Sequence, residues 1–309
     1  MADLPLFVRL QYLLPKQALT RLAGWAAEAR GGWLTTAFIR WFIGRYKVDM
    51  SEAANPDPAS YPTFNAFFTR ALHNGVRPAA DGDCLLMPVD GAVSALGPIA
   101  SDQIFQAKGH HYSTQALLGG DAALAQPFAN GSFATIYLSP RDYHRIHLPL
   151  AGTLRTMVYV PGELFSVNPV TVAHVPGLFA RNERLVTIWD TAVGPMALVL
   201  VGATIVGSIE TVWAGTVTPP RGTAPFTWHY PSSGSNAVQL GRGAEMGRFK
   251  LGSTVVLLFG EAAVSFARNL EAATPVRLNQ CFAYAGAETP AVNSANLDAA
   301  DDDSADSGV

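Results

Sequence analysis

The sequence predicts an α+β protein in which amphipathic N-terminal helices precede a β-rich core. Apolar residues recur at helical spacing in the first fifty residues, and from Cys84 onward short β-branched runs alternate with Gly, Pro, Asn and Asp. Hydrophobic residues make up 49% of the 309 residues and charged residues only 15%, against roughly 25% charged in typical soluble domains. This surplus of apolar residues indicates a large buried interior or contact with a membrane.

The first fifty residues are expected to form amphipathic helices. Pro15 interrupts the first apolar stripe, and the segment holds seven Lys or Arg against three acidic residues, a net charge of +4. Two interpretations remain open: the helices pack an apolar face on the core, as amphipathic helices commonly do, or residues 1–50 lie on an anionic membrane. The apolar positions recur three or four residues apart: Leu6, Leu10, Leu13, Leu14, Leu19, Leu22, Trp25, Trp33, Ala37, Phe38, Trp41 and Phe42.

Residues 51–285 are expected to form the β-rich domain, and residues 286–309 an acidic, disordered tail without aromatic or basic residues. The uncharged stretch from Gly194 to Ile209 is shorter than the roughly 18–20 residues of a membrane-spanning helix, so we expect buried strands there. The chain begins without a signal-peptide pattern, and its two cysteines, Cys84 and Cys281, show no metal or redox spacing. A reducing, cytoplasmic setting fits these features.

The segment PRDYHRIHLP carries His144 and His147 three residues apart, with two arginines and one aspartate beside them. The arginines disfavour a bound cation, so no metal site is expected. Paired histidines next to arginines suit proton transfer or the binding of an anion, and a polar turn at the end of a strand is the structural alternative.

Two further segments carry candidate residues. In MPVDGAVSAL, Asp90 precedes Gly91, which is first of all a turn signal, but a carboxylate near a histidine and a serine can also orient the imidazole. In RFKLGSTVVLLFG, Gly252 and Ser253 stand directly before an apolar strand. The segment is either a glycine bulge with strand hydroxyls, or a site at which the backbone is cut and Ser253 is chemically changed.

Signatures of two common enzyme classes are missing from the chain. No G-x-S-x-G elbow surrounds a serine, and neither G-x-x-x-x-G-K-[ST] nor G-x-G-x-x-G after a strand occurs. A standard α/β-hydrolase and nucleotide chemistry are therefore disfavoured, and no nucleic-acid partner is expected.

Seven segments together resemble the phosphatidylserine decarboxylase family, in its bacterial, membrane-associated type. The similarity runs from the N-terminal helices to about Phe266. LGST alone is a weak signal, but seven segments in the order of the family are a strong one. The segments are PVDG, PRDYHRIHLP, YVPGELFSVNP, LFARNER, VGATIVGSIETVWAGTVTPPR, EMGRFK and LGST.

The resemblance implies that the chain is a proenzyme that cleaves itself in its catalytic domain, residues 51–285. The Ser253 hydroxyl attacks the carbonyl of Gly252 and forms an ester; elimination and hydrolysis then leave a pyruvoyl group at position 253. His147 is implied as the base, with Asp90 holding its tautomer. The hydroxyl of the following threonine or nearby backbone N–H groups are expected to stabilise the oxyanion.

The reaction that the resemblance implies is the decarboxylation of phosphatidylserine to phosphatidylethanolamine, with the covalent pyruvoyl group as cofactor and His144 handling substrate and protons. The expected partners are phosphatidylserine, an anionic membrane surface on the cytoplasmic side of the cell membrane, and the two cleaved chains, which stay associated. The sequence leaves open whether the protein forms a homo-oligomer. The alternatives are a pyruvoyl-dependent decarboxylase of another amine acid, a Ser-His-Asp lipid hydrolase, and a peripheral lipid-binding protein without catalysis.

Overall fold

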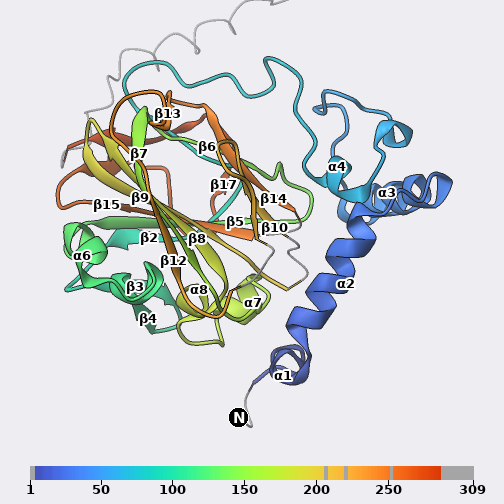
Figure 1. Ribbon diagram of the computed structural model, residues 1–309, viewed down its shortest axis with the longest axis horizontal. Helices are drawn as coiled ribbons and strands as arrows, with labels where there is room; N and C mark the ends of the chain where they lie inside the picture. The colour runs from blue at the N-terminus through green and yellow to red at the C-terminus, as the bar shows by residue number, and fades with distance from the viewer. Residues whose placement is uncertain (1–3, 205–207, 219–221, 251–252, 287–309) are drawn as a thin grey trace, which may run out of the picture.

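Strands dominate the structure, and its longer helices gather at the N-terminal end (Figure 1). This computed structural model describes residues 4–204, 208–218, 222–250 and 253–286. The predicted α+β class with a β-rich core is confirmed. Gly252, and the predicted tail apart from its first residue, lie outside the described residues.

The longer helices precede the sheets, and the later ones are single turns that start at local caps. Thr63, for example, starts α4 because its side chain accepts a hydrogen bond from the Ala66 N–H. The helices are α1 (Leu6–Leu13), α2 (Lys16–Glu28), α3 (Trp33–Tyr46), α4 (Phe64–Phe68), α5 (Thr114–Leu117), α6 (Ala122–Ala125), α7 (Pro169–Val172) and α8 (Leu178–Arg181), with 3-10 turns η1 (Pro58–Ser60) and η2 (Gln126–Phe128).

The strands follow one another closely from Leu85 onward. They are β1 (Leu85–Leu86), β2 (Gly91–Pro98), β3 (Gln103–Ala107), β4 (His110–Ser113), β5 (Ser132–Leu138), β6 (Arg145–His147), β7 (Gly152–Val160), β8 (Arg184–Thr191), β9 (Gly194–Val201), β10 (Ser208–Thr211), β11 (Gly215–Thr218), β12 (Phe226–His229), β13 (Gln239–Leu240), β14 (Glu245–Lys250), β15 (Ser253–Phe259), β16 (Val264–Phe266), β17 (Pro275–Val276) and β18 (Cys281–Ala285).

A nine-stranded antiparallel sheet forms the centre of the core. Its strands run in the order β12-β7-β8-β9-β15-β5-β2-β17, with β13 paired to β7. The four-stranded sheet β11-β10-β14-β6 brings the histidine segment next to the chain just before Ser253, because β6 pairs with β14. Every residue of β15 is buried, which explains why this strand is an unbroken apolar run after its first two residues.

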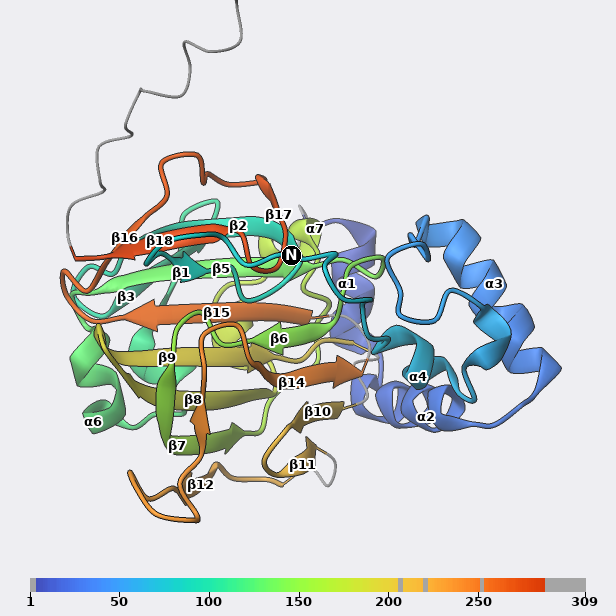
Figure 2. The ribbon, with the colours of Figure 1, turned by 90° about the horizontal axis from the view of Figure 1, so that it is seen from above.

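Helices α1 to α4 lie on one side of the β-rich body (Figures 1 and 2). Helices α3 and α4, with parts of α2, share a small hydrophobic cluster of their own, separate from the main core. Its buried residues are Ala27, Ile39, Phe42, Val48, Phe64, Phe67 and Phe68.

Much of the apolar stripe on α1 to α3 is exposed instead of packed on the core. Leu13 is 82% exposed, Trp33 76%, Trp25 73% and Leu6 72%. The interpretation of these stripes as core-packing faces is therefore wrong for these residues, although it is correct for Phe42, which is 7% exposed. Large exposed apolar patches generally mark a surface that contacts a partner or a membrane. Within the described ranges, no helix is both long and apolar enough to cross a bilayer.

Helix α1 is fixed to a loop of the β-rich body by side-chain hydrogen bonds. The buried amide of Gln11 accepts from the Ser166 N–H at 2.7 Å and donates to the Thr171 hydroxyl at 3.1 Å. Lys16, at the start of α2, lies 3.0 Å from the carboxylate of Glu163. The exposed helices are thus joined to the loop that lines the cavity described next.

Candidate active site

Ser253 is the first residue of β15 and pairs with Leu138 at the end of β5. Its side chain is 1% exposed, and its Oγ has no hydrogen-bond partner among the described residues. A buried hydroxyl without a partner costs roughly 1–3 kcal/mol. Ser253 shares this feature with other hydroxyls of the described residues, among them Ser132 and Ser265. Its strand is held on both sides, by β5 and β9, which fixes the position of the hydroxyl.

Ser253 lines a cavity of about 180 Å³ between the main sheet and the N-terminal helices. Helix α3 contributes Phe42 and Tyr46 to its wall, and α4 contributes Phe68. The loop that Gln11 fixes contributes the polar side chains of Ser166 and Asn168, and the rest of the wall is mostly apolar. The remaining wall residues are Tyr137, Leu138, Pro140, Val167, Ala203 and Thr204.

His144 is fully buried and packs against Phe68, a wall residue of the Ser253 cavity, with 4.0 Å between the ring centroids and 43° between the ring planes. Its Nδ1 lies 2.8 Å from the carbonyl oxygen of Asp142, which can only accept, so Nδ1 carries the proton. Nε2 is then the unprotonated nitrogen, and it is buried without a hydrogen-bond partner in the part of the chain that the structure describes. Burial lowers the pKa of His144 to about 3. The ring is therefore a neutral base with a free lone pair.

His147 is held in a different setting, although it is only three residues away. Its Nδ1 donates to the carbonyl of Gly243 at 2.8 Å, and its Nε2 lies 3.3 Å from the hydroxyl of Tyr143. Burial lowers its pKa, and the nearby carboxylates of Glu245 and Asp90 oppose that shift. The tautomer of His147 is set by a backbone carbonyl.

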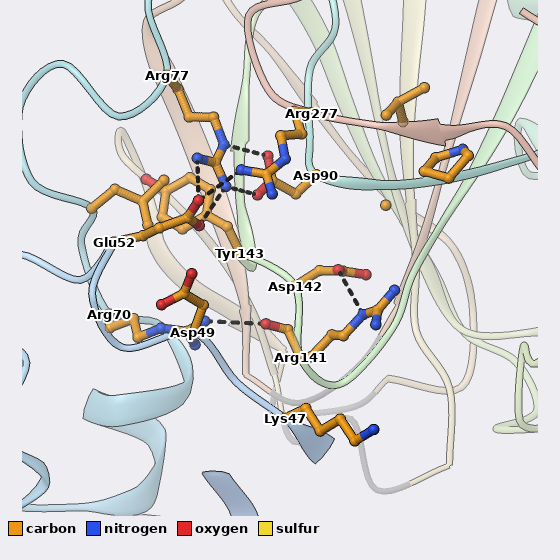
Figure 3. A pocket seen from close by; sticks show the side chains of 14 residues that line it. Lys47, Asp49, Glu52, Arg70, Arg77, Asp90, Arg141, Asp142, Tyr143 and Arg277 are labelled. Carbon is orange, nitrogen blue, oxygen red and sulfur yellow. Dashed lines mark hydrogen bonds and ion pairs between the residues drawn. The ribbon is translucent and has the colours of Figure 1, made fainter. Parts of the chain in front are cut away.

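Asp90 is bound by an arginine and a backbone N–H instead of by His147 (Figure 3). Its carboxylate accepts from Arg77 Nε at 3.0 Å and Nη2 at 2.6 Å, and from the Leu278 N–H at 2.7 Å. The expected hydrogen bond from His147 to Asp90 is absent among the described residues. Position 91, directly after Asp90, is a glycine because a side chain there would collide with the carbonyl of Tyr137 on β5. The turn that the sequence suggested is not the reason.

The structure thus brings part of the predicted set together. Ser253 and His144 share the wall residue Phe68, and the Phe249 N–H on β14 donates to the His144 carbonyl at 3.0 Å. Asp90 reaches His147 only through its electrostatic field. Sequence reasoning missed Arg77 and the aromatic wall of the cavity. Two sequence signals could have pointed to that wall: the aromatic run in FNAFFTRAL, which holds Phe68, and the apolar stripe that ends at Phe42.

The groups available at the cavity are the Ser253 hydroxyl in its wall and the neutral imidazole of His144, which packs against the wall residue Phe68. Such a site can move a proton and hold a small covalent group on the residue at position 253. In the ranges that the structure describes, His, Cys, Asp and Glu form no group suited to a metal ion.

The buried neutral state of His144 predicts that the protein loses stability in mild acid. The unfolded imidazole binds a proton below about pH 6.5, but the folded one does so only near pH 3. Between these values the unfolded state binds more protons, so the free energy of unfolding falls as the pH falls, by about 1.4 kcal/mol per pH unit.

We therefore expect the thermal midpoint to drop between pH 6.5 and pH 5, and to drop less steeply in His144→Gln. The control His229→Gln, at an exposed site on β12, should keep the wild-type slope. Equal slopes for wild type and His144→Gln would contradict the buried neutral state.

Comparisons with known proteins find similarity to one family over nearly the whole chain. A family model described as phosphatidylserine decarboxylase matches residues 64–284, and a second one, described as PSD, matches residues 6–47. A phosphatidylserine decarboxylase proenzyme of Shewanella denitrificans is 63% identical over 278 residues, which cover 89% of this chain and 96% of the relative. Proenzymes of the same name from Shewanella halifaxensis and Aliivibrio salmonicida are 62% and 61% identical, over 89% and 90% of this chain and 97% of each relative.

Proposed function

The chain belongs to the phosphatidylserine decarboxylase family, and from that premise we propose that it converts phosphatidylserine to phosphatidylethanolamine and carbon dioxide in phospholipid biosynthesis. The proposed cofactor is a pyruvoyl group formed from Ser253 after cleavage of the Gly252–Ser253 bond. The observation that carries the proposal is the buried Ser253 hydroxyl, which has no partner among the described residues and lines a cavity at the start of a buried strand.

Cleavage requires that the Ser253 oxygen attack the carbonyl carbon of Gly252, as its proton passes to a base. The C–N bond then breaks, the serine nitrogen takes up a proton, and an ester joins Gly252 to the serine oxygen. Elimination across the serine Cα–Cβ bond releases residues 1–252 as a carboxylate, and water converts the remaining dehydroalanine to a pyruvoyl group and ammonia. Gly252 lies outside the described residues, so the support comes from Ser253: a hydroxyl held by strand pairing has a high effective concentration near its own backbone.

We assign the bases according to the surroundings of the two histidines. His147 is the proposed base for cleavage, and His144 the proposed group for substrate handling and proton transfer. Asp90 supports His147 through its negative charge, which favours the imidazolium that forms when His147 takes a proton. The unpartnered Nε2 of His144 supports a role in moving protons next to the cavity.

The residues around position 253 fit a pyruvoyl group. The cavity adjoins position 253, and its wall is mostly apolar with a few polar side chains in fixed positions. The pyruvoyl group supplies an electron sink for the loss of carbon dioxide. Ser166 and Asn168 can orient the polar head of a substrate, and the unprotonated Nε2 of His144 can accept a proton.

The exposed N-terminal helices support a lipid as the substrate. Helix α3 presents Trp33 and Trp41 to the outside, and its inner residues Phe42 and Tyr46 line the Ser253 cavity. A bilayer in contact with α3 would therefore lie close to the cavity. We propose that residues 1–50 associate with anionic membrane surfaces and that the protein is peripheral, on the cytoplasmic side of the cell membrane.

The alternatives receive less support. A Ser-His-Asp hydrolase needs a serine bonded to a histidine, and Ser253 Oγ has no such partner among the described residues. The carboxylate of Asp90 is also occupied by Arg77. A decarboxylase of a soluble amine acid has no use for the exposed apolar surface on α1 to α3.

A vesicle assay tests the substrate and the membrane surface together. Wild-type protein should form phosphatidylethanolamine and carbon dioxide in equal amounts from vesicles that contain phosphatidylserine. Trp25→Ser and Trp33→Ser should each weaken vesicle binding by roughly tenfold, because each exposed indole loses its burial in the interface. Turnover of soluble glycerophosphoserine should stay unchanged in both variants.

Phe226→Ser is the matched control, because Phe226 is also exposed, at 57%, but lies on β12 in the β-rich body. Its vesicle binding should equal that of wild type. Vesicle binding that depends on Phe226 but not on the two tryptophans would place the membrane surface elsewhere, and a wild-type protein that forms no phosphatidylethanolamine would overturn the proposed reaction.

A further inference from the structure

A second cavity, of about 310 Å³, lies next to the Ser253 cavity and has strongly charged walls (Figure 3). The two cavities are neighbours along three segments: Tyr46 lines one and Lys47 the other, and the same holds for Phe68 and Arg70 and for Pro140 and Arg141. The charged wall residues of the second cavity are Lys47, Arg70, Arg77, Arg141 and Arg277, and Asp49, Glu52, Asp90 and Asp142.

Most of the acidic side chains in this cavity already have partners. Arg77 lies 2.6 Å from Asp90 and 2.7 Å from Glu52, and Arg277 lies 2.6 Å from Glu52. The carboxylate of Asp142 accepts from the backbone N–H and the hydroxyl of Ser139, at 2.6 and 2.7 Å. These pairs neutralise Arg77 and Arg277. On the other side of the cavity three cations, Lys47, Arg70 and Arg141, face two carboxylates, Asp49 and Asp142, and Asp142 lies 3.9 Å from Arg141 Nε (Figure 3).

Arg70 is a buried cation that forms no ion pair among the described residues. Arg70 lies two residues after the end of α4 and is only 5% exposed. Nη2 donates to the carbonyl of Arg141 at 3.2 Å, whereas Nε is buried and has no partner among the described residues. No carboxylate of the described residues lies within ion-pair distance of it. The guanidinium also lies 5.4 Å from the ring centroid of Phe67, which holds it in place against the aromatic cluster.

An arginine keeps its proton even when it is buried, and a buried charge without a partner costs several kcal/mol. Burial accordingly lowers the pKa of Arg70, which measures the same cost. An anion in the cavity would offset this cost. Lys47 and Arg141 are exposed at the same cavity and would add positive charge at its mouth.

We propose that this cavity is an oxyanion site in which Arg70 binds a phosphate group, with Lys47 and Arg141 at the entrance. A guanidinium matches the spacing of two phosphate oxygens, and two further cations suit an anion with more than one charged oxygen. The phosphate comes from one of two sources, a phospholipid head group or free phosphate. The first source rests on the proposed function, since the neighbouring cavity would hold the reacting end of that head group.

The test measures phosphate binding without turnover, by ³¹P NMR titration of full-length protein with inorganic phosphate and, separately, with glycerophosphoethanolamine, which has no carboxylate to lose. Arg70→Gln should weaken phosphate binding by about 10- to 100-fold, because one charge-assisted contact is lost. Arg141→Gln, at an exposed side chain, should weaken it about two- to fivefold by loss of long-range attraction. Arg155→Gln, on β7 and paired with Asp190, removes the same charge elsewhere and should change nothing.

Each outcome of the titrations either supports or overturns the proposed phosphate site. Binding of both probes, weakened by Arg70→Gln, assigns the site to the head group; binding of inorganic phosphate alone assigns it to free phosphate. Phosphate binding that is absent in wild type, or equally affected by Arg155→Gln, overturns the site. If Arg70→Gln fails to fold, Arg70→Lys and Arg141→Gln carry the test, and unchanged affinity in both rejects the proposal. Failure of the proposed decarboxylation would appear separately, as wild-type protein that binds phosphate but forms no phosphatidylethanolamine.

Discussion

Ser253→Ala is expected to give a single uncut chain without detectable decarboxylase activity. The alanine has no oxygen to attack the Gly252 carbonyl, so neither the chain break nor the pyruvoyl group can form. Gel electrophoresis of the purified protein, with an assay for carbon dioxide release, measures both effects. The thermal midpoint should not fall, because the Ser253 hydroxyl has no hydrogen-bond partner to lose within the described ranges.

Ser265→Ala is the matched control for this variant. Ser265 lies on β16, and its Oγ is likewise buried without a partner among the described residues. The Ser265→Ala chain should be cut and active like wild type. An active Ser253→Ala protein would contradict the role of Ser253 as the source of the cofactor.

The second large effect is a division of roles between His144 and His147. His147→Ala should leave the chain uncut, because Ser253 loses its proposed base. His144→Ala should still be cut, at least in part, but its turnover should fall by about 10²- to 10⁴-fold, the range found when a general acid or base is removed. The cut fraction is measured by gel electrophoresis, and the turnover is calculated per cut molecule.

His229→Ala, at an exposed position on β12, is the control and should match wild type in both measurements. If His144→Ala stops cleavage and His147→Ala does not, the two roles must be exchanged. Such a result would fit the unpartnered Nε2 of His144 beside the cavity, since His147 Nε2 already has the Tyr143 hydroxyl as a neighbour.

The fold class could be predicted because local patterns carry it. The β-branched run after Ser253 reads as a strand in the sequence and is a fully buried strand in the sheet. The helical spacing of Leu6, Leu10 and Leu13 likewise gave a helix that ends before Pro15. Exposure could not be read in this way, because an apolar stripe has the same spacing whether it faces a core or a membrane.

The site could be predicted only in part, because charge pairing depends on which segments meet in space. Arg77 and Asp90 are 13 residues apart in the chain, yet they share two hydrogen bonds. Because Arg77 occupies its carboxylate, Asp90 does not form the expected hydrogen bond with His147. Its negative charge still opposes the lowering of the pKa of His147 by burial. The lack of an ion pair at Arg70 among the described residues depends in the same way on every neighbour that folding brings to it.

The intact mass of the purified wild-type protein tests the central claim most directly. The account predicts two masses and no full-length chain after complete processing: residues 1–252 with a normal carboxyl end, and residues 253–309 with a pyruvoyl group in place of the amino-terminal serine. The two pieces should elute together from a sizing column, because β15 lies between β9 and β5 in one sheet. A fully active protein with the single mass of the uncut 309-residue chain and an unmodified serine at position 253 would contradict the account.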